Sequence, residues 1–291
     1  FDCCATSMGS RQLRRWITRP TRDHHEINVR NDSVSELLSH PATKVSECLR
    51  QIGDIERMLS RVSIGSARPF DLVRLRNGYR VLPDLVNQLK NYDSARLKEI
   101  TNLTGPEPKL VKFLDQAISD EPPALLRDGG VIRAGFDLDL DELRELQSSS
   151  TARLFEFEKR EQDSSGIRSL KVKFNRVHGY YIEIPKSHTG DIPTHYHRRQ
   201  TLKNVERYST DELKSFEDLL LSAKEKGLAR ERLLYNQILE RLQPDVSRLQ
   251  RGAQALAQLD VLDTFARRAA DLNLCRPLLT REPKLQIKAG R

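Results

Sequence analysis

Apolar side chains recur every three or four residues over most of the chain, which is the spacing of one face of an α-helix. Ser7 and Asp23 are placed to cap the first two such runs, which stop at Pro20 and Pro41. The predicted helices cover residues 7–20, 23–41, 45–62, 69–89, 110–118, 137–163 and 210–270. Pro244 is predicted to kink or split the last of them.

The segment 164–208 follows a different period. Apolar and polar residues alternate over 170–175 and again over 180–184, on either side of a short loop at 176–179. A period of two predicts a β-hairpin. Residues 199–208 are predicted to form a further extended stretch, and residues 127–132 a tight turn into a short extended piece. We therefore expect a mainly α protein with a small antiparallel β module at the tip of two long helices.

The net charge is concentrated on that module. Segment 164–208 holds nine Lys and Arg against three acidic residues, a net +6 of the +8 carried by all 291 residues. Four of the seven histidines lie there as well. Such a concentration favours a polyanion as the partner, because Lys and Arg neutralise phosphates. A solvated β surface kept soluble by charge is the alternative.

The composition and motifs exclude several classes of protein. Hydrophobic residues make up only 37%, which is lean for one large core, and there is no apolar stretch of the roughly 20 residues that a membrane span needs. No phosphate-binding G-x-x-x-x-G-K-[ST] loop, G-x-S-x-G elbow or H-E-x-x-H motif occurs. His195 and His197 would need a third ligand to hold zinc. We find no active site and expect neither catalysis nor a bound metal in this chain.

The four cysteines, at positions 3, 4, 48 and 275, show no metal-ligand spacing and indicate a reducing compartment. The chain begins without Met and ends at IKAGR. We expect it to be an excised fragment.

Four stretches resemble the MutS family of bacterial DNA mismatch repair proteins. They are FNRVHGYYI (174–182), RRQTLKNVERY (198–208), LRDGGVI (126–132) and the opening DCCATSMGSR (2–11). The matches are long, ordered as in the family and spread over essentially the whole chain.

The resemblance implies a long-helix core or lever domain with a small clamp domain inserted at its tip. In that family the levers join an ABC-type ATPase to clamps that close around duplex DNA without sequence preference. The implied domains are a first lever part at 1–150, the clamp at 151–210, returning lever helices at 211–275, and the truncated start of a missing ATPase domain at 276–291.

The family also implies partners and cofactors. The expected partners are duplex DNA, a second MutS protomer and a MutL-type repair protein, and no membrane. ATP and Mg are expected only in the parent's ATPase domain, and the location is expected to be cytoplasmic and nucleoid-associated. The family's mismatch-reading Phe-x-Glu is missing, since no Phe has Glu two residues later. This chain is therefore expected neither to recognise a mismatch nor to hydrolyse ATP.

Transferred onto this sequence, the family motifs indicate Lys203, Asn204 and Asn175 as contacts to the DNA backbone. Charge and position add four cations: Arg198, Arg199, Lys171 and Lys173. His178, Gly179 and Tyr181 are interpreted instead as residues that set and pack the hairpin. Two other functions remain open, namely a structural helical dimerisation scaffold without DNA contact, and an RNA- or nuclease-type enzyme that uses the histidines.

Overall fold

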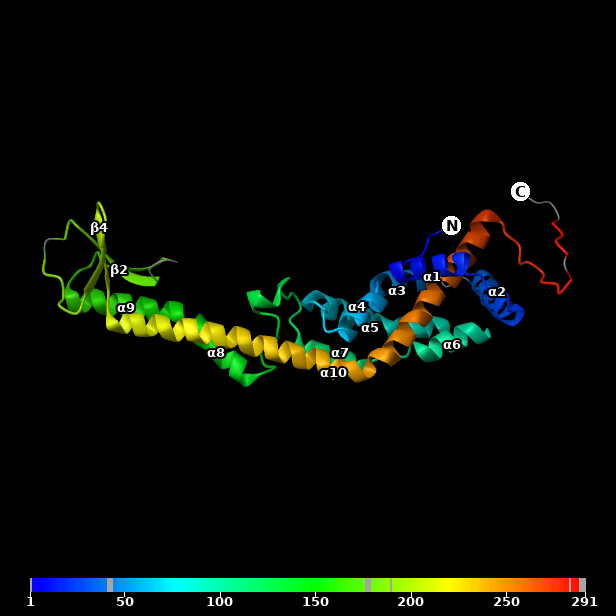
Figure 1. The fold of residues 1–291 in the computed structure, drawn as a ribbon, viewed down its shortest axis with the longest axis horizontal. Helices are drawn as coiled ribbons and strands as arrows, with labels where there is room; N and C mark the ends of the chain where they lie inside the picture. Colours follow the sequence, from blue (N-terminus) through cyan, green and yellow to red (C-terminus); the bar gives the residue numbers. More distant parts are fainter. Residues whose placement is uncertain (1, 41–43, 176–178, 189, 283, 288–291) are drawn as a thin grey trace. The chain divides into compact units, whose positions relative to one another are not determined.

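The computed structural model describes residues 2–40, 44–175, 179–188, 190–282 and 284–287 (Figure 1). The chain divides into two units, the first formed by residues 1–125 with 236–291 and the second by residues 126–235. The predicted fold class is confirmed, because the described chain is mainly helical and holds one small antiparallel sheet of four strands. None of the described helices is long and apolar enough to cross a lipid bilayer.

The first unit is built from seven helices of the described chain and the C-terminal part of an eighth. They are α1 (Ser7–Thr18), α2 (His24–Ser39), α3 (Val45–Ile52), α4 (Ile55–Ser63), α5 (Pro69–Leu89), α6 (Ala95–Leu103), α7 (Pro108–Ala117) and α10 (Asp211–Leu272). Helices α3, α4 and α7 pack on α5, whose Leu72, Leu75 and Leu85 are fully buried. The apolar stripe seen in the sequence is therefore the core of this unit.

Several helices begin or end at residues other than those predicted, because local hydrogen bonds and backbone angles set the boundaries. Thr6 rather than Ser7 caps α1, because its hydroxyl accepts a hydrogen bond from the Gly9 N–H at 3.0 Å. The single helix predicted at 45–62 is two, since Gly53 ends α3 with a φ of 70° and Asp54 caps α4. Asp23 caps α2 as predicted. The predicted break at Pro41 lies outside the described residues, and α6 was not predicted.

The start of α1 is held by one buried carboxylate of α10. Asp260, which is fully buried, accepts hydrogen bonds from the N–H of Ala5 at 2.7 Å and from the N–H and hydroxyl of Thr6 at 2.8 and 2.7 Å. A Cβ on Gly9 would lie 2.1 Å from this carboxylate, so only glycine fits there. These contacts explain why the opening motif has Thr at position 6 and Gly at position 9.

The second unit contains α8 (Leu138–Ser148), α9 (Ser150–Ser165), the four strands and the first part of α10. The helix predicted at 137–163 is interrupted at Ser149 and capped at its start by Asp137. Helix α10 is continuous from Asp211 to Leu272, so Pro244 does not split it. Of residues 276–291, the predicted start of the ATPase domain, the described ones (276–282 and 284–287) form neither helix nor strand.

The Gly-Gly turn of the second unit is tied to α10 by Glu231. This carboxylate, 2% exposed, accepts hydrogen bonds from the N–H groups of Gly130 at 3.0 Å, Val131 at 2.5 Å and Ile132 at 2.8 Å. The Arg144 guanidinium donates to the same carboxylate at 2.9 Å. Gly129 and Gly130 both have positive φ, which lets three successive N–H groups converge on one acceptor.

The sheet has the strand order β1-β2-β4-β3, with all neighbours antiparallel. The strands are β1 (Lys171–Asn175), β2 (Gly179–Pro185), β3 (His197–Thr201) and β4 (Val205–Ser209). The predicted hairpin at 170–184 is confirmed as β1 and β2. The stretch predicted as one extended piece at 199–208 is instead two strands joined by a tight turn.

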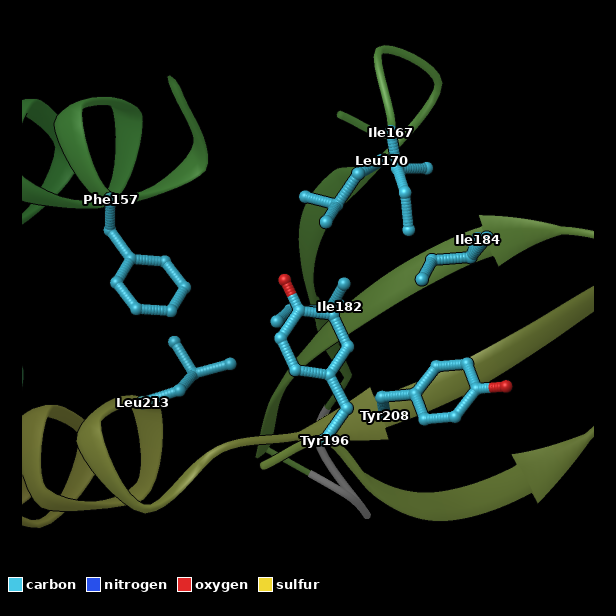
Figure 2. Close-up of a cluster of buried hydrophobic side chains, with 8 residues drawn as sticks. All are labelled: Phe157, Ile167, Leu170, Ile182, Ile184, Tyr196, Tyr208 and Leu213. Atoms are coloured by element: carbon cyan, nitrogen blue, oxygen red, sulfur yellow. The ribbon is translucent and has the colours of Figure 1, made fainter. Parts of the chain in front are cut away.

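One face of the sheet packs on α9 and on the start of α10. Its buried cluster consists of Phe157, Ile167, Leu170, Ile182, Ile184, Tyr196, Tyr208 and Leu213 (Figure 2). The Tyr196 hydroxyl donates to the buried Glu161 carboxylate of α9 at 2.7 Å. Burial, together with this hydrogen bond, raises the pKa of Tyr196. The cluster attaches the strands to both helices and leaves the opposite face of the sheet to carry charge.

Candidate nucleic-acid interface

The strand register brings the polar residues of the sheet to its other face. Lys173 pairs with Tyr181, Lys171 with Glu183, and Glu183 with Arg207 across β1, β2 and β4. Residues paired across antiparallel strands point to the same side. We call this side the cationic face, defined by Lys171, Lys173, Asn175, Tyr181, Glu183, Gln200 and Arg207.

Glu183 lies between two of the cations on this face. The Lys173 ammonium donates to it at 2.6 Å, and the Arg207 Nε is 3.6 Å from its other oxygen. The hydrogen bond from Lys173 to Glu183 raises the pKa of Lys173. This amine therefore stays charged at neutral pH.

Three side chains surround Arg207: Glu183, Gln200 and Tyr181. It donates to the Gln200 amide oxygen at 3.0 Å, and its guanidinium carbon lies 4.4 Å from the centre of the Tyr181 ring. Tyr181 is buried beneath it, 5% exposed. Arg207 is one of the nine cations counted in segment 164–208, but the sequence does not identify it as a DNA contact. Only the strand register shows that it lies on the same face as Lys173. The signal that could have found it is the alternation of residues 205, 207 and 209 with Tyr208, which is buried.

Lys171 is exposed, and within the described chain its side chain has no ion pair or hydrogen bond. Asn175 closes β1 opposite Gly179 and is half-buried. Three of the predicted contacts, Lys171, Lys173 and Asn175, therefore lie together on one strand and one face.

Lys203 and Asn204 form the turn between β3 and β4, closed by a hydrogen bond from the Leu202 N–H to the Val205 carbonyl at 2.9 Å. Both turn residues are exposed. The Asn204 carbonyl accepts from the Lys186 N–H at 3.0 Å, which fixes the turn beside the end of β2. The Lys203 side chain has no ion-pair partner in the part of the chain that the structure describes.

Of the two predicted arginines, Arg198 is not on the cationic face. Arg198 pairs with Tyr208 and so lies on the helix-packed side, 3.3 Å from Glu206 and with its guanidinium carbon 5.9 Å from the Tyr208 ring. Arg199 occupies the irregularity in register between Arg198 and Gln200 and is exposed. The structure thus separates Arg198 from Lys171 and Lys173.

The hairpin end nearest α10 is fixed by a glycine and a glutamate. Gly179 has a φ of 71°, and a Cβ there would lie 2.0 Å from a Glu217 carboxylate oxygen. The Tyr180 N–H donates to Glu217 at 3.4 Å. The interpretation of Gly179 as a residue that sets the hairpin agrees with this geometry, whereas His178 lies outside the described residues.

The histidines of this unit have separate surroundings. His195 lies 3.6 Å from Glu161, and His197 lies 3.8 Å from Asp211. Among the described residues no group of three or more His, Cys, Asp or Glu is arranged to hold a metal ion.

Comparison with known families agrees with this arrangement. The sequence model described as MutS domain III matches residues 1–266, which include the whole second unit with its four strands and the first unit as far as residue 266. This match spans far more than half of the chain. The chain therefore belongs to the MutS family of DNA mismatch repair proteins, in which it corresponds to MutS domain III.

Proposed function

We propose that the second unit grips the backbone of duplex DNA through its cationic face and the β3–β4 turn. The observation that carries the proposal is the sidedness of the sheet. Apolar side chains of β1, β2 and β4 pack on the helices, while Lys171, Lys173 and Arg207 share the other side. Any strand that buries one face turns its polar residues to the other, so what favours DNA is that three of the residues gathered there are cations.

The residue types favour phosphates over bases. Lys and Arg neutralise phosphates and release counterions, which supplies affinity without sequence information. Asn204 adds a neutral amide donor on an exposed turn next to Lys203. We therefore expect binding that is steeply salt-dependent and indifferent to sequence and to mismatches.

The wider role follows from family membership and is part of the proposal. In the parent protein, the helices of this region would couple an ATPase domain that binds ATP and Mg to the DNA-gripping unit. A second protomer would supply the other half of the grip, and a MutL-type protein would act downstream. This chain itself would bind DNA without catalysis.

The coupling can be tested in the full-length protein by inserting Gly-Pro after Leu220, within α10. A proline in a helix interior removes a backbone hydrogen bond and kinks or breaks the helix. We expect DNA binding to persist while its response to ATP is lost. A normal ATP response with the insertion in place would refute coupling through α10.

The grip is tested by fluorescence anisotropy of the 291-residue chain on a matched and a mismatched duplex across a salt series. The double variant Lys171→Gln/Lys203→Gln should bind more weakly and lower the salt slope by about 0.9 for each phosphate that is no longer neutralised. Lys109→Gln/Lys112→Gln is the matched control, because both lysines are exposed on α7 and the net charge changes equally.

Three results would contradict the proposal. Equal loss of affinity in both double variants would mean that net charge alone attracts DNA. Unchanged affinity after Lys203, Arg198 and Arg199 are replaced by Gln together with Lys171, with helicity preserved, would favour the structural scaffold. A clear preference for the mismatched duplex would refute binding to the backbone alone.

A further inference from the structure

Glu183 is the one acidic residue among those that define the cationic face. It lies at the centre of the face, on β2, with a cation-bearing strand on each side. Its side chain is only 14% exposed, because Lys173 and Arg207 cover it. A carboxylate at the centre of a surface that binds polyanions works against that binding, so its position needs a reason.

The two oxygens of Glu183 engage different cations. Oε1 accepts from the Lys173 ammonium at 2.6 Å, and Oε2 lies 3.6 Å from the Arg207 Nε. The second distance is too long for a hydrogen bond. Among the described residues the buried Arg207 Nε–H has no acceptor. The carboxylate therefore neutralises both cations but satisfies the donors of only one.

A DNA phosphate that approaches this face meets the same donors, those of Lys173 and Arg207. Phosphates and carboxylates both accept charge-assisted hydrogen bonds from Lys and Arg, and the two non-bridging oxygens of a DNA phosphate can engage two cations as the two oxygens of a carboxylate do. Resting on the proposed function above, we propose that Glu183 occupies the place of a DNA phosphate between Lys173 and Arg207 and thereby limits the strength of the grip.

This assigns different roles to the cations of the unit. Lys171 and Lys203 have no internal ion pair in the described chain and are available to the first phosphates. Lys173 and Arg207 bind DNA only when a phosphate displaces Glu183 from them. A grip limited in this way holds DNA but releases it readily, which suits a contact that must not be fixed at one position.

The test is Glu183→Gln, which keeps the shape of the side chain and removes its charge. If Lys173 and Arg207 become available, each phosphate that they neutralise steepens the salt slope by about 0.9, which is roughly a threefold further loss of affinity between about 50 and 200 mM salt. We therefore expect binding at least about threefold tighter than that of the unmodified chain near 50 mM salt, with the difference shrinking as salt rises.

Glu156→Gln is the matched control. Glu156 is exposed on α9 in the same unit, and its removal changes the net charge by the same amount. It should leave the salt slope unchanged. Glu183→Thr serves as a second neutral variant, because a β-branched side chain suits a strand. Circular dichroism and thermal unfolding of each variant show whether the sheet is intact.

A second experiment tests whether the effect of Glu183 acts through Lys173 and Arg207. In a chain that already carries Lys173→Gln and Arg207→Gln, removing the Glu183 charge should no longer tighten binding. Tightening that persists there would overturn the proposal, because it would show a general charge effect.

The outcomes separate this inference from the proposed function. Salt-dependent binding by the unmodified chain that Glu183→Gln leaves unchanged or weakens would overturn the inference alone, and would make Glu183 a residue that orients its neighbours. If neither the unmodified chain nor Glu183→Gln binds DNA in a salt-dependent manner, both the inference and the proposed function are overturned.

Discussion

The buried carboxylate of Glu231 provides the sharpest prediction about stability. It accepts three successive backbone N–H groups of the Gly-Gly turn and the Arg144 guanidinium. Glu231→Ala removes the acceptor for all of them at once. Because Gly130 is exposed, its N–H can be hydrated after the substitution. Val131 and Ile132 are 0% and 2% exposed, so their N–H groups would be left without a partner.

The expected cost follows from those two buried donors. A buried donor left unsatisfied costs about 1–3 kcal/mol, so two give roughly 2–6 kcal/mol. Partial movement of the turn toward water lowers this, and we expect about 2–4 kcal/mol. That is a large share of the roughly 5–15 kcal/mol by which folded domains are typically stable.

The assay is native-state hydrogen exchange read at the amides of residues 130–132, because the chain has two units and a single global unfolding free energy is not well defined. Glu240→Ala is the control, since Glu240 is exposed on the same helix and should change the opening free energy by less than about 0.5 kcal/mol. If the Val131 and Ile132 amides exchange at the same rate in Glu231→Ala as in the unmodified chain, the reasoning from buried donors is wrong.

Three further outcomes are expected. Burial raises the pKa of the Cys4 thiol to about 12, so iodoacetamide should modify the exposed Cys275 far faster at neutral pH; comparable rates by mass spectrometry would contradict this. Gly179→Ala should destabilise the hairpin by about 1–2 kcal/mol because of the positive φ, and by a further amount because the new Cβ clashes with Glu217. Adding Glu217→Ala should recover only the cost of the clash, as thermal unfolding would show. Burial raises the pKa of Asp263, so the folded state binds its proton more tightly and this group's contribution to stability falls as pH rises through the window above its ordinary value. Asp263→Asn should therefore gain stability relative to the unmodified chain as pH rises above about 4, the ordinary pKa of an aspartate, in urea unfolding, and a difference independent of pH would refute the assignment.

Patterns within one element were predicted well from the sequence. The alternation over 170–184 identified β1 and β2, and it also placed Lys171 and Lys173 opposite an apolar side. Both results follow from the period of two, which is a property of any strand that buries one face. Family motifs selected Lys203 and Asn204 as contacts to the DNA backbone, which stays a prediction; the structure places both on one exposed turn.

Breaks between elements were predicted less well. The apolar stripe continues through Gly53 and Asp54, so the spacing alone joined α3 to α4. Residues 199–208 contain no Gly or Pro to announce the turn between β3 and β4. In both places the stop depends on a local hydrogen bond or a positive φ, which hydrophobic spacing does not report.

The sequence by itself determined the mainly helical class, the site of the small β module and the concentration of positive charge on it, because period and charge are properties of neighbouring residues. Only the tertiary structure decided which charges act together. Strand register placed Arg207 and Glu183 beside Lys173, and turned Arg198 to the other side of the sheet. Folding likewise brought Glu231 to a turn about a hundred residues earlier in the chain. These partners are distant in sequence, and a one-residue shift in register would have exchanged the faces on which they lie.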